Sequence, residues 1–177
     1  MKHFFQKSII VASVFAFVIG VSSFTKVKKA TATAYQITSI STEKNGTGEQ
    51  QQWTWAVSNP SPGNGDNGTL QDVSHWSIPL SPLAEASLVS AEYSFDQITW
   101  ISVSTQVDRD PTIKSCTGDD VLKFDVGTKG SEPTYYRVTF DQSFGTNSFA
   151  TSYIKTGGGR NGCNLYYFAG VGGTTND

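Results

Sequence analysis

The stretch Gln51-Gln52-Trp53-Thr54-Trp55-Ala56-Val57-Ser58 places a large apolar side chain at every second position. Trp53, Trp55 and Val57 fall on one face of an extended chain, and the smaller Thr54 and Ala56 fall on the other. A period of two is typical of a strand with one buried face, and indole rings contribute strongly to a core. The stretch therefore predicts a β-strand whose aromatic face is covered by another layer.

The same pattern recurs along the chain in short segments divided by turn residues. Further strands are expected at residues 73–78, 87–95, 98–104, 121–126, 135–140, 149–155 and 163–168. The strands at 87–95 and 98–104 form a hairpin closed by Asp96-Gln97. About eight or nine strands at this spacing predict an all-β fold, a single antiparallel β-sandwich of jelly-roll or immunoglobulin-like kind. A β-barrel is the alternative.

Two segments depart from the strand pattern. Residues 81–89 are a short helix candidate, with Pro82 at a first-turn position. Residues 59–68 contain two prolines, three glycines and three asparagines, which predicts a long loop with no apolar residue to bury. The helical content is therefore expected to be small.

The first 34 residues predict a secretory signal peptide. Lys2, His3 and Lys7 form a positive start, and a mostly apolar run follows at 9–24. This run is shorter than the roughly 20 apolar residues that span a bilayer. Small residues set cleavage between about residues 22 and 34, with Ala32-Thr33-Ala34 as the better match. An uncleaved membrane anchor is the alternative.

Cleavage would leave a single β-sandwich domain at 35–177, long enough to bury its own core. This domain is expected to be secreted, periplasmic or at the cell surface, with no membrane span after cleavage. Cys116 and Cys163 are the two cysteines of the chain. An even count in an oxidising compartment predicts one disulfide between them.

The net charge of the chain indicates whether a nucleic acid is a suitable partner. The formal net charge is −2 at pH 7, and removal of the basic signal makes the remaining chain more acidic. Proteins that bind nucleic acid present a basic face. We therefore expect no nucleic-acid partner.

His75 is the only histidine after residue 34, and this limits the available chemistry. A zinc site built on several histidines is excluded. A Ser-His-Asp triad would have to use His75, and its neighbour Ser74 is expected to point to the opposite face of a strand. We therefore expect His75 to be structural, hydrogen-bonded under the adjacent loop, with a place in a ligand site as the alternative.

Acidic residues gather around Cys116. Asp108, Asp110, Asp119 and Asp120 supply carboxylates from one expected loop region. Calcium prefers six to eight oxygen ligands, and such a loop could supply some of them, although the spacing matches neither an EF-hand nor a repeat calcium loop. These four residues are therefore candidate metal ligands, with calcium as the candidate cofactor and ordinary turn chemistry as the alternative.

Aromatic residues suggest a binding face. Aromatic rings exposed on a β-sandwich can stack on sugar rings, although most aromatics serve the core. Tyr166, Tyr167 and Phe168 are consecutive, so at least one of them points outward. Trp76, Tyr166 and Tyr167, with His75, are the candidate ligand-binding residues.

Three motifs occur in a fixed order. Ser74-His75-Trp76-Ser77-Ile78 is an S-H-W-x-aliphatic element, and residues 118–125 match a G-x-D-x-aliphatic-K-F-D-like segment. Ile154-Lys155-Thr156-Gly157 ends a strand in K-x-G, and Cys163 follows. In this order the motifs resemble a group of small secreted bacterial β-domains of unassigned function. The resemblance implies an extracellular β-domain and no catalytic residues.

The leading functional expectation is a secreted, non-catalytic module for adhesion or for contact with an extracellular glycan, matrix or surface protein. The first alternative is a small secreted carbohydrate-active hydrolase or lyase that uses scattered Asp and Glu residues. The second is a self-assembling surface subunit whose exposed strand edges pair between copies.

Overall fold

The structure is a computed structural model that describes residues 34–44, 50–114, 116–157 and 163–174. The expected signal peptide, except for Ala34, lies outside the described residues. No helix in the described ranges is long and apolar enough to cross a membrane.

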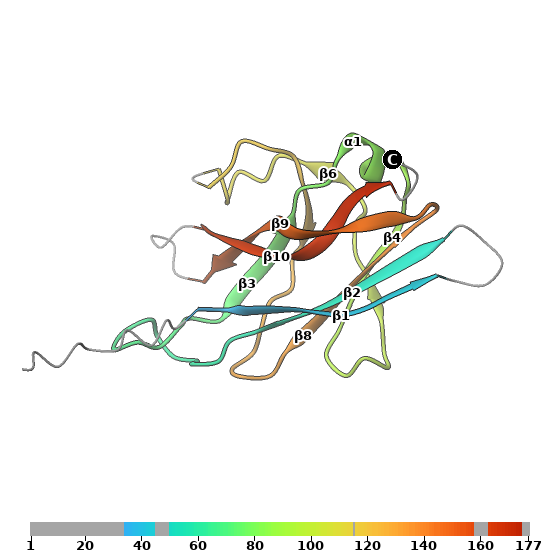
Figure 1. The fold of residues 1–177 in the computed structure, drawn as a ribbon. Coiled ribbons are helices and arrows are strands. Elements are labelled where there is room, and N and C mark those ends of the chain that lie inside the picture. Colours follow the sequence, from blue (N-terminus) through green and yellow to red (C-terminus); the bar gives the residue numbers. More distant parts are fainter. Residues whose placement is uncertain (1–33, 45–49, 115, 158–162, 175–177) are drawn as a thin grey trace, which may run out of the picture. The chain divides into compact units, whose positions relative to one another are not determined.

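Ten strands form two five-stranded antiparallel sheets that pack as a sandwich (Figure 1). One sheet has the order β1 (Gln36–Lys44), β2 (Gln51–Ser58), β8 (Thr134–Phe140), β4 (Leu88–Ser94) and β5 (Ile101–Ser102). The other has the order β10 (Cys163–Thr174), β9 (Phe144–Thr156), β3 (Val73–Ile78), β7 (Val121–Phe124) and β6 (Val107–Asp108). The predicted β-sandwich is confirmed, and the barrel alternative is wrong because the two sheets do not close on each other.

The core between the sheets is built from aromatic rings. Trp76 of β3 is fully buried, and its ring centroid lies 4.9 Å from that of Tyr136 and 5.6 Å from that of Phe124. Trp55 of β2 crosses from the opposite sheet, with its centroid 5.8 Å from that of Trp76. The aromatic face of residues 51–58 is thus covered by the second sheet, as predicted.

The short helix forms within its predicted range. The helix α1 (Pro82–Ala86) begins after Ser81, whose hydroxyl accepts a 3.2 Å hydrogen bond from the Ala84 amide. Ser87 ends the helix, with its backbone N–H bonded to the Leu83 carbonyl. The helix is shorter than expected because β4 starts at Leu88.

The prediction of a two-residue turn in the hairpin is wrong. β4 and β5 pair as predicted, but residues 95–100 separate them rather than Asp96-Gln97 alone. The carboxylate of Asp96 accepts hydrogen bonds from the amides of Ile98 and Thr99, at 2.8 and 2.7 Å. This side-chain bonding replaces ladder pairing and opens a longer loop.

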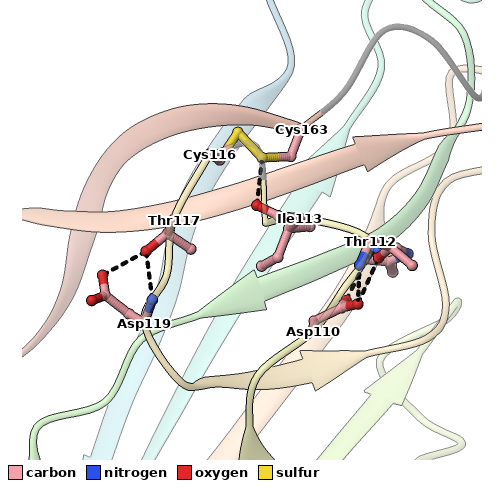
Figure 2. The surroundings of a disulfide bond; sticks show 8 residues. Asp110, Thr112, Ile113, Cys116, Thr117, Asp119 and Cys163 are labelled. Atoms are coloured by element: carbon pink, nitrogen blue, oxygen red, sulfur yellow. Dashed lines mark hydrogen bonds and ion pairs between the residues drawn. A yellow bond between two sulfur atoms is a disulfide. The ribbon is translucent and has the colours of Figure 1, made fainter.

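A strap of residues 109–114 and 116–120 covers part of the outer face of the second sheet (Figure 2). Ile113 of this strap is buried against Val121 and Tyr153, which point away from the aromatic core. The predicted disulfide between Cys116 and Cys163 is confirmed and ties the strap to β10. The Cys163 sulfur also lies 3.4 Å from the Ile113 carbonyl oxygen. The sandwich therefore carries a second, smaller apolar cluster outside its core.

Candidate functional site

A hollow of about 250 Å³ opens at one end of the sandwich, where the start of β1 meets β9 and β10. We call it the tyrosine hollow. Its lining comes from four parts of the chain and consists of Tyr35, Gly65, Thr69, Leu70, Gln71, Thr156, Asn164 and Tyr166. None of these described lining residues carries a charged side chain. Pockets that bury drug-sized ligands measure about 300–1,000 Å³, so the tyrosine hollow suits a smaller, neutral ligand.

Two tyrosine rings meet beside the hollow. The ring of Tyr35 is 5% exposed and meets the half-buried ring of Tyr166 edge to face, with centroids 6.0 Å apart. The Tyr35 hydroxyl donates a hydrogen bond to the Gln71 carbonyl oxygen. This arrangement fixes both rings against the loop that precedes β3.

Both phenols stay neutral over the ordinary pH range. Burial raises the pKa of Tyr35 to about 12, and the nearby Tyr166 and Asp72 reinforce the shift. Burial also raises the pKa of Tyr166, against a hydrogen bond from the Tyr35 backbone. The hollow therefore offers phenol, amide and hydroxyl groups, which both donate and accept hydrogen bonds without a charge.

The loop wall of the hollow is held by its own hydrogen bonds. The buried Asn59 amide donates to the carbonyl oxygens of Leu70 and Gln71, at 3.0 and 3.2 Å. The Gln71 side-chain amide donates to the Asn64 carbonyl at 3.1 Å. Gly65 sits in the same wall with φ of 93°, a backbone conformation that favours glycine. The wall is thus pre-formed, and a ligand would not need to order it.

The structure separates the two tyrosines singled out in the sequence. Tyr166 lines the hollow, whereas Tyr167 points to the other side of β10 and is 66% exposed. Leu165 is exposed on the same side as Tyr167. The expectation that at least one of the consecutive aromatics points outward is confirmed.

The other two candidate ligand residues lie away from this hollow. Trp76 is fully buried in the core and has no exposed surface to offer a ligand. His75 is buried under the strap, with Nε2 3.0 Å from the Thr112 hydroxyl and 3.3 Å from the Asp110 carboxylate. His75 is therefore hydrogen-bonded under a covering loop, as expected.

Ser74 differs from its expected orientation. Val73 is paired with Thr156 and His75 with Lys155, so β3 holds one more residue than β9 at this point. Such a β-bulge breaks the alternation of side chains. The Ser74 hydroxyl consequently lies 3.3 Å from Nδ1 of His75, so the expectation of opposite faces is wrong.

The four carboxylates proposed as metal ligands have separate partners. Asp110 lies 3.3 Å from the Lys123 ammonium, and Asp119 accepts a 2.6 Å hydrogen bond from Thr117 (Figure 2). Asp108 accepts from the Gln106 amide at 2.9 Å, and Asp120 faces Arg109 at 3.6 Å. Within the described ranges, no three His, Cys, Asp or Glu residues converge on one point. The structure therefore does not bring these four residues together.

Several lining residues carried no signal in the sequence. Tyr35 stands at the expected domain start, Gln71 lies before the expected strand at 73–78, and Asn164 lies near the start of the expected strand at 163–168. Polar residues at strand ends are common, and nothing in their spacing links them to Tyr166. Only the sheet order, which brings β1 beside β10, assembles the hollow.

Comparison of the chain with known proteins finds no match. No protein-family model matches the chain, and neither a curated protein nor a solved structure matches it.

Proposed function

We propose that this protein is an extracellular carbohydrate-binding module and that the tyrosine hollow takes one neutral sugar residue. The observation that carries the proposal is the combination of two tyrosines with amide and hydroxyl groups around a small, uncharged concavity. Sugar rings present alternating apolar C–H faces and hydroxyl groups. An aromatic ring with a few well-placed polar groups complements both.

The chemistry of the lining favours a neutral sugar over an acidic one. A uronic or sialic acid would place its carboxylate in a hollow whose described lining offers no cation. Asp72, which acts on the Tyr35 phenol, adds unfavourable negative potential nearby. An acidic sugar would therefore lose solvation without gaining an ion pair.

The disulfide supports a location outside the cytoplasm. Disulfides persist in oxidising compartments, and Cys116–Cys163 links the strap to β10. Together with the expected signal peptide, it favours a secreted, periplasmic or surface protein that meets extracellular glycans.

A single small hollow gives weak binding. A hexose has about twelve non-hydrogen atoms, and at ~0.3 kcal/mol per atom its affinity is in the millimolar range. Dense display of a glycan raises the apparent affinity by avidity. The suitable screen is therefore a glycan array with densely coupled sugars.

The array, run with two variants, distinguishes binding in the tyrosine hollow from binding on the outer face of β10. The protein is expressed from its full sequence into an oxidising compartment and screened with and without calcium. Binding to one neutral sugar class is expected, lost in Tyr166→Ala and kept in the matched control Tyr167→Ala. Loss in Tyr167→Ala alone would move the site to the outer face, and a blank array with folded protein would overturn the proposal in favour of protein adhesion or self-assembly.

A further inference from the structure

The β-bulge in β3 creates a second polar constellation, outside the tyrosine hollow. The exposed Ser74 hydroxyl donates a 3.0 Å hydrogen bond to the Lys155 carbonyl oxygen, and it also lies 3.3 Å from Nδ1 of His75. A hydroxyl between an imidazole nitrogen and a carbonyl oxygen can donate its proton to either of them. Access to solvent leaves this hydroxyl open to an approaching electrophile.

The strap determines which nitrogen of His75 carries the proton. Thr112 donates a 2.7 Å hydrogen bond to the Asp110 carboxylate, so its hydroxyl oxygen is left to accept from His75 Nε2 at 3.0 Å. The other carboxylate oxygen of Asp110 lies 3.3 Å from the same Nε2 and can only accept. Nε2 therefore carries the proton, and the lone pair of Nδ1 faces Ser74.

Burial favours the neutral form of the imidazole. Burial lowers the pKa of His75 below 6.5, and the ammonium groups of Lys123 and Lys155 lower it while Asp110 and Asp125 oppose them. Burial also acts to raise the pKa of Asp110, but hydrogen bonds from Thr112 and Lys123 outweigh it and hold the pKa low. A neutral imidazole oriented by a buried carboxylate is the form that acts as a general base.

We propose that Ser74 is a nucleophile that His75 activates and that its substrates are acyl esters that reach the exposed hydroxyl at the protein surface. Ser74 Oγ bonds to the ester carbonyl carbon while its proton passes to Nδ1 of His75. The C–O bond to the alcohol then breaks, and the alcohol leaves with that proton. Water hydrolyses the acyl-serine by the same route in reverse and releases the acid.

Lys155 is the cation available to the developing negative charge. Its ammonium is close enough to lower the pKa of His75, and its backbone carbonyl contacts Ser74 directly. One cation on a flexible stem stabilises an oxyanion less than fixed backbone donors do. Turnover is therefore slow, and covalent labelling is the better readout.

A fluorophosphonate probe tests the nucleophile directly in the full-length protein. In the reaction Ser74 Oγ bonds to phosphorus, fluoride leaves and His75 takes the hydroxyl proton. The expected product is a single adduct that peptide mapping assigns to Ser74, absent in Ser74→Ala and kept in Ser148→Ala, a matched exposed serine on β9. Labelling of Ser148 at the same rate as Ser74, or no adduct, would overturn the proposal.

The dependence of the labelling rate on pH distinguishes activation of Ser74 by His75 from labelling of a merely exposed serine. The labelling rate should rise with pH through the lowered pKa of His75 and then level off, and His75→Gln should label at least about a hundredfold more slowly. Thr112→Val removes the hydroxyl that contacts His75 and Asp110 from an exposed position of the strap, and it should shift the midpoint of the profile without unfolding the core. A profile that follows hydroxide with no plateau, or a His75→Gln rate equal to that of the wild type, would contradict activation by His75.

Discussion

The ring of Tyr166 meets the ring of Tyr35 edge to face, with centroids 6.0 Å and planes 75° apart. This contact joins the start of β1 to β10, the edge strands of opposite sheets. The same two rings line the tyrosine hollow. Binding at the hollow and the anchoring of the first strand therefore depend on one pair of side chains.

Removing the hydroxyl of Tyr35 should destabilise the protein modestly. Tyr35→Phe leaves the Gln71 carbonyl without the hydrogen bond from this buried phenol, at a cost of about 1 kcal/mol. The free energy of unfolding in urea measures the change. Tyr167→Phe alters an exposed phenol and should stay within about 0.5 kcal/mol of the wild type, so equal losses would contradict the role of Tyr35.

Sugar binding should not depend on pH between about pH 5 and pH 9, because the phenols are the only titrating groups among the described lining residues. The pKa of Tyr35 is raised to about 12, so the folded state favours the neutral phenol. The contribution of the Tyr35 phenol to the free energy of unfolding is complete below the ordinary pKa of 10. It is lost as the pH rises from there towards about 12. Affinity measured across this range would contradict a neutral hollow if it followed a titration near neutral pH.

The stability of the protein should fall as the pH drops below about 6.5, because the pKa of His75 is lowered in the folded state. Below this pH the unfolded chain binds a proton that the folded imidazole resists. Asp110, whose pKa is also lowered, adds a further loss as the pH falls below about 3.8. Urea unfolding from pH 8 to pH 5 should show a slope that His75→Gln flattens, and parallel curves for the two proteins would contradict this account.

The disulfide should contribute most of the stability of the strap. Its cysteines are 47 residues apart, and closing a loop of that length contributes about 4 kcal/mol in the chain-entropy model. Replacing Cys116 and Cys163 together by Ser should lower the free energy of unfolding by a comparable amount and expose the strap to protease. Cleavage inside the sandwich before the strap would contradict the role of the disulfide in holding the strap.

Strands with strong alternation were predictable from the sequence. Val73–Ile78 and Gln51–Ser58 were expected with the bounds that the structure shows, because each buries a clear aromatic or aliphatic face. β1 was missed, since most of its side chains are polar and exposed on an edge strand. β10 runs beyond its expected end to Thr174 because Gly172 allows a close approach: a Cβ there would lie 2.9 Å from the Gly145 carbonyl oxygen.

The candidate sites were less predictable for a physical reason. Tyr166 could be singled out from three consecutive aromatics, but its partner Tyr35 is brought to it only by the order of the sheets. The Ser74 hydroxyl reaches His75 because of a bulge, and period-two reasoning assigns it to the wrong face. Register shifts and contacts between edges depend on tertiary pairing, which a single sequence does not encode locally.

Amide proton–nitrogen NMR spectra recorded during titration with N-acetylglucosamine, galactose and glucuronic acid test the sugar-binding hollow most directly. A neutral sugar should shift the amides of Gly65, Thr69 and Asn164, Tyr166→Ala should abolish these shifts, and glucuronic acid should cause none. Shifts confined to Leu165 and Tyr167 on the outer face of β10, or no shifts with any neutral sugar, would contradict sugar binding in the hollow.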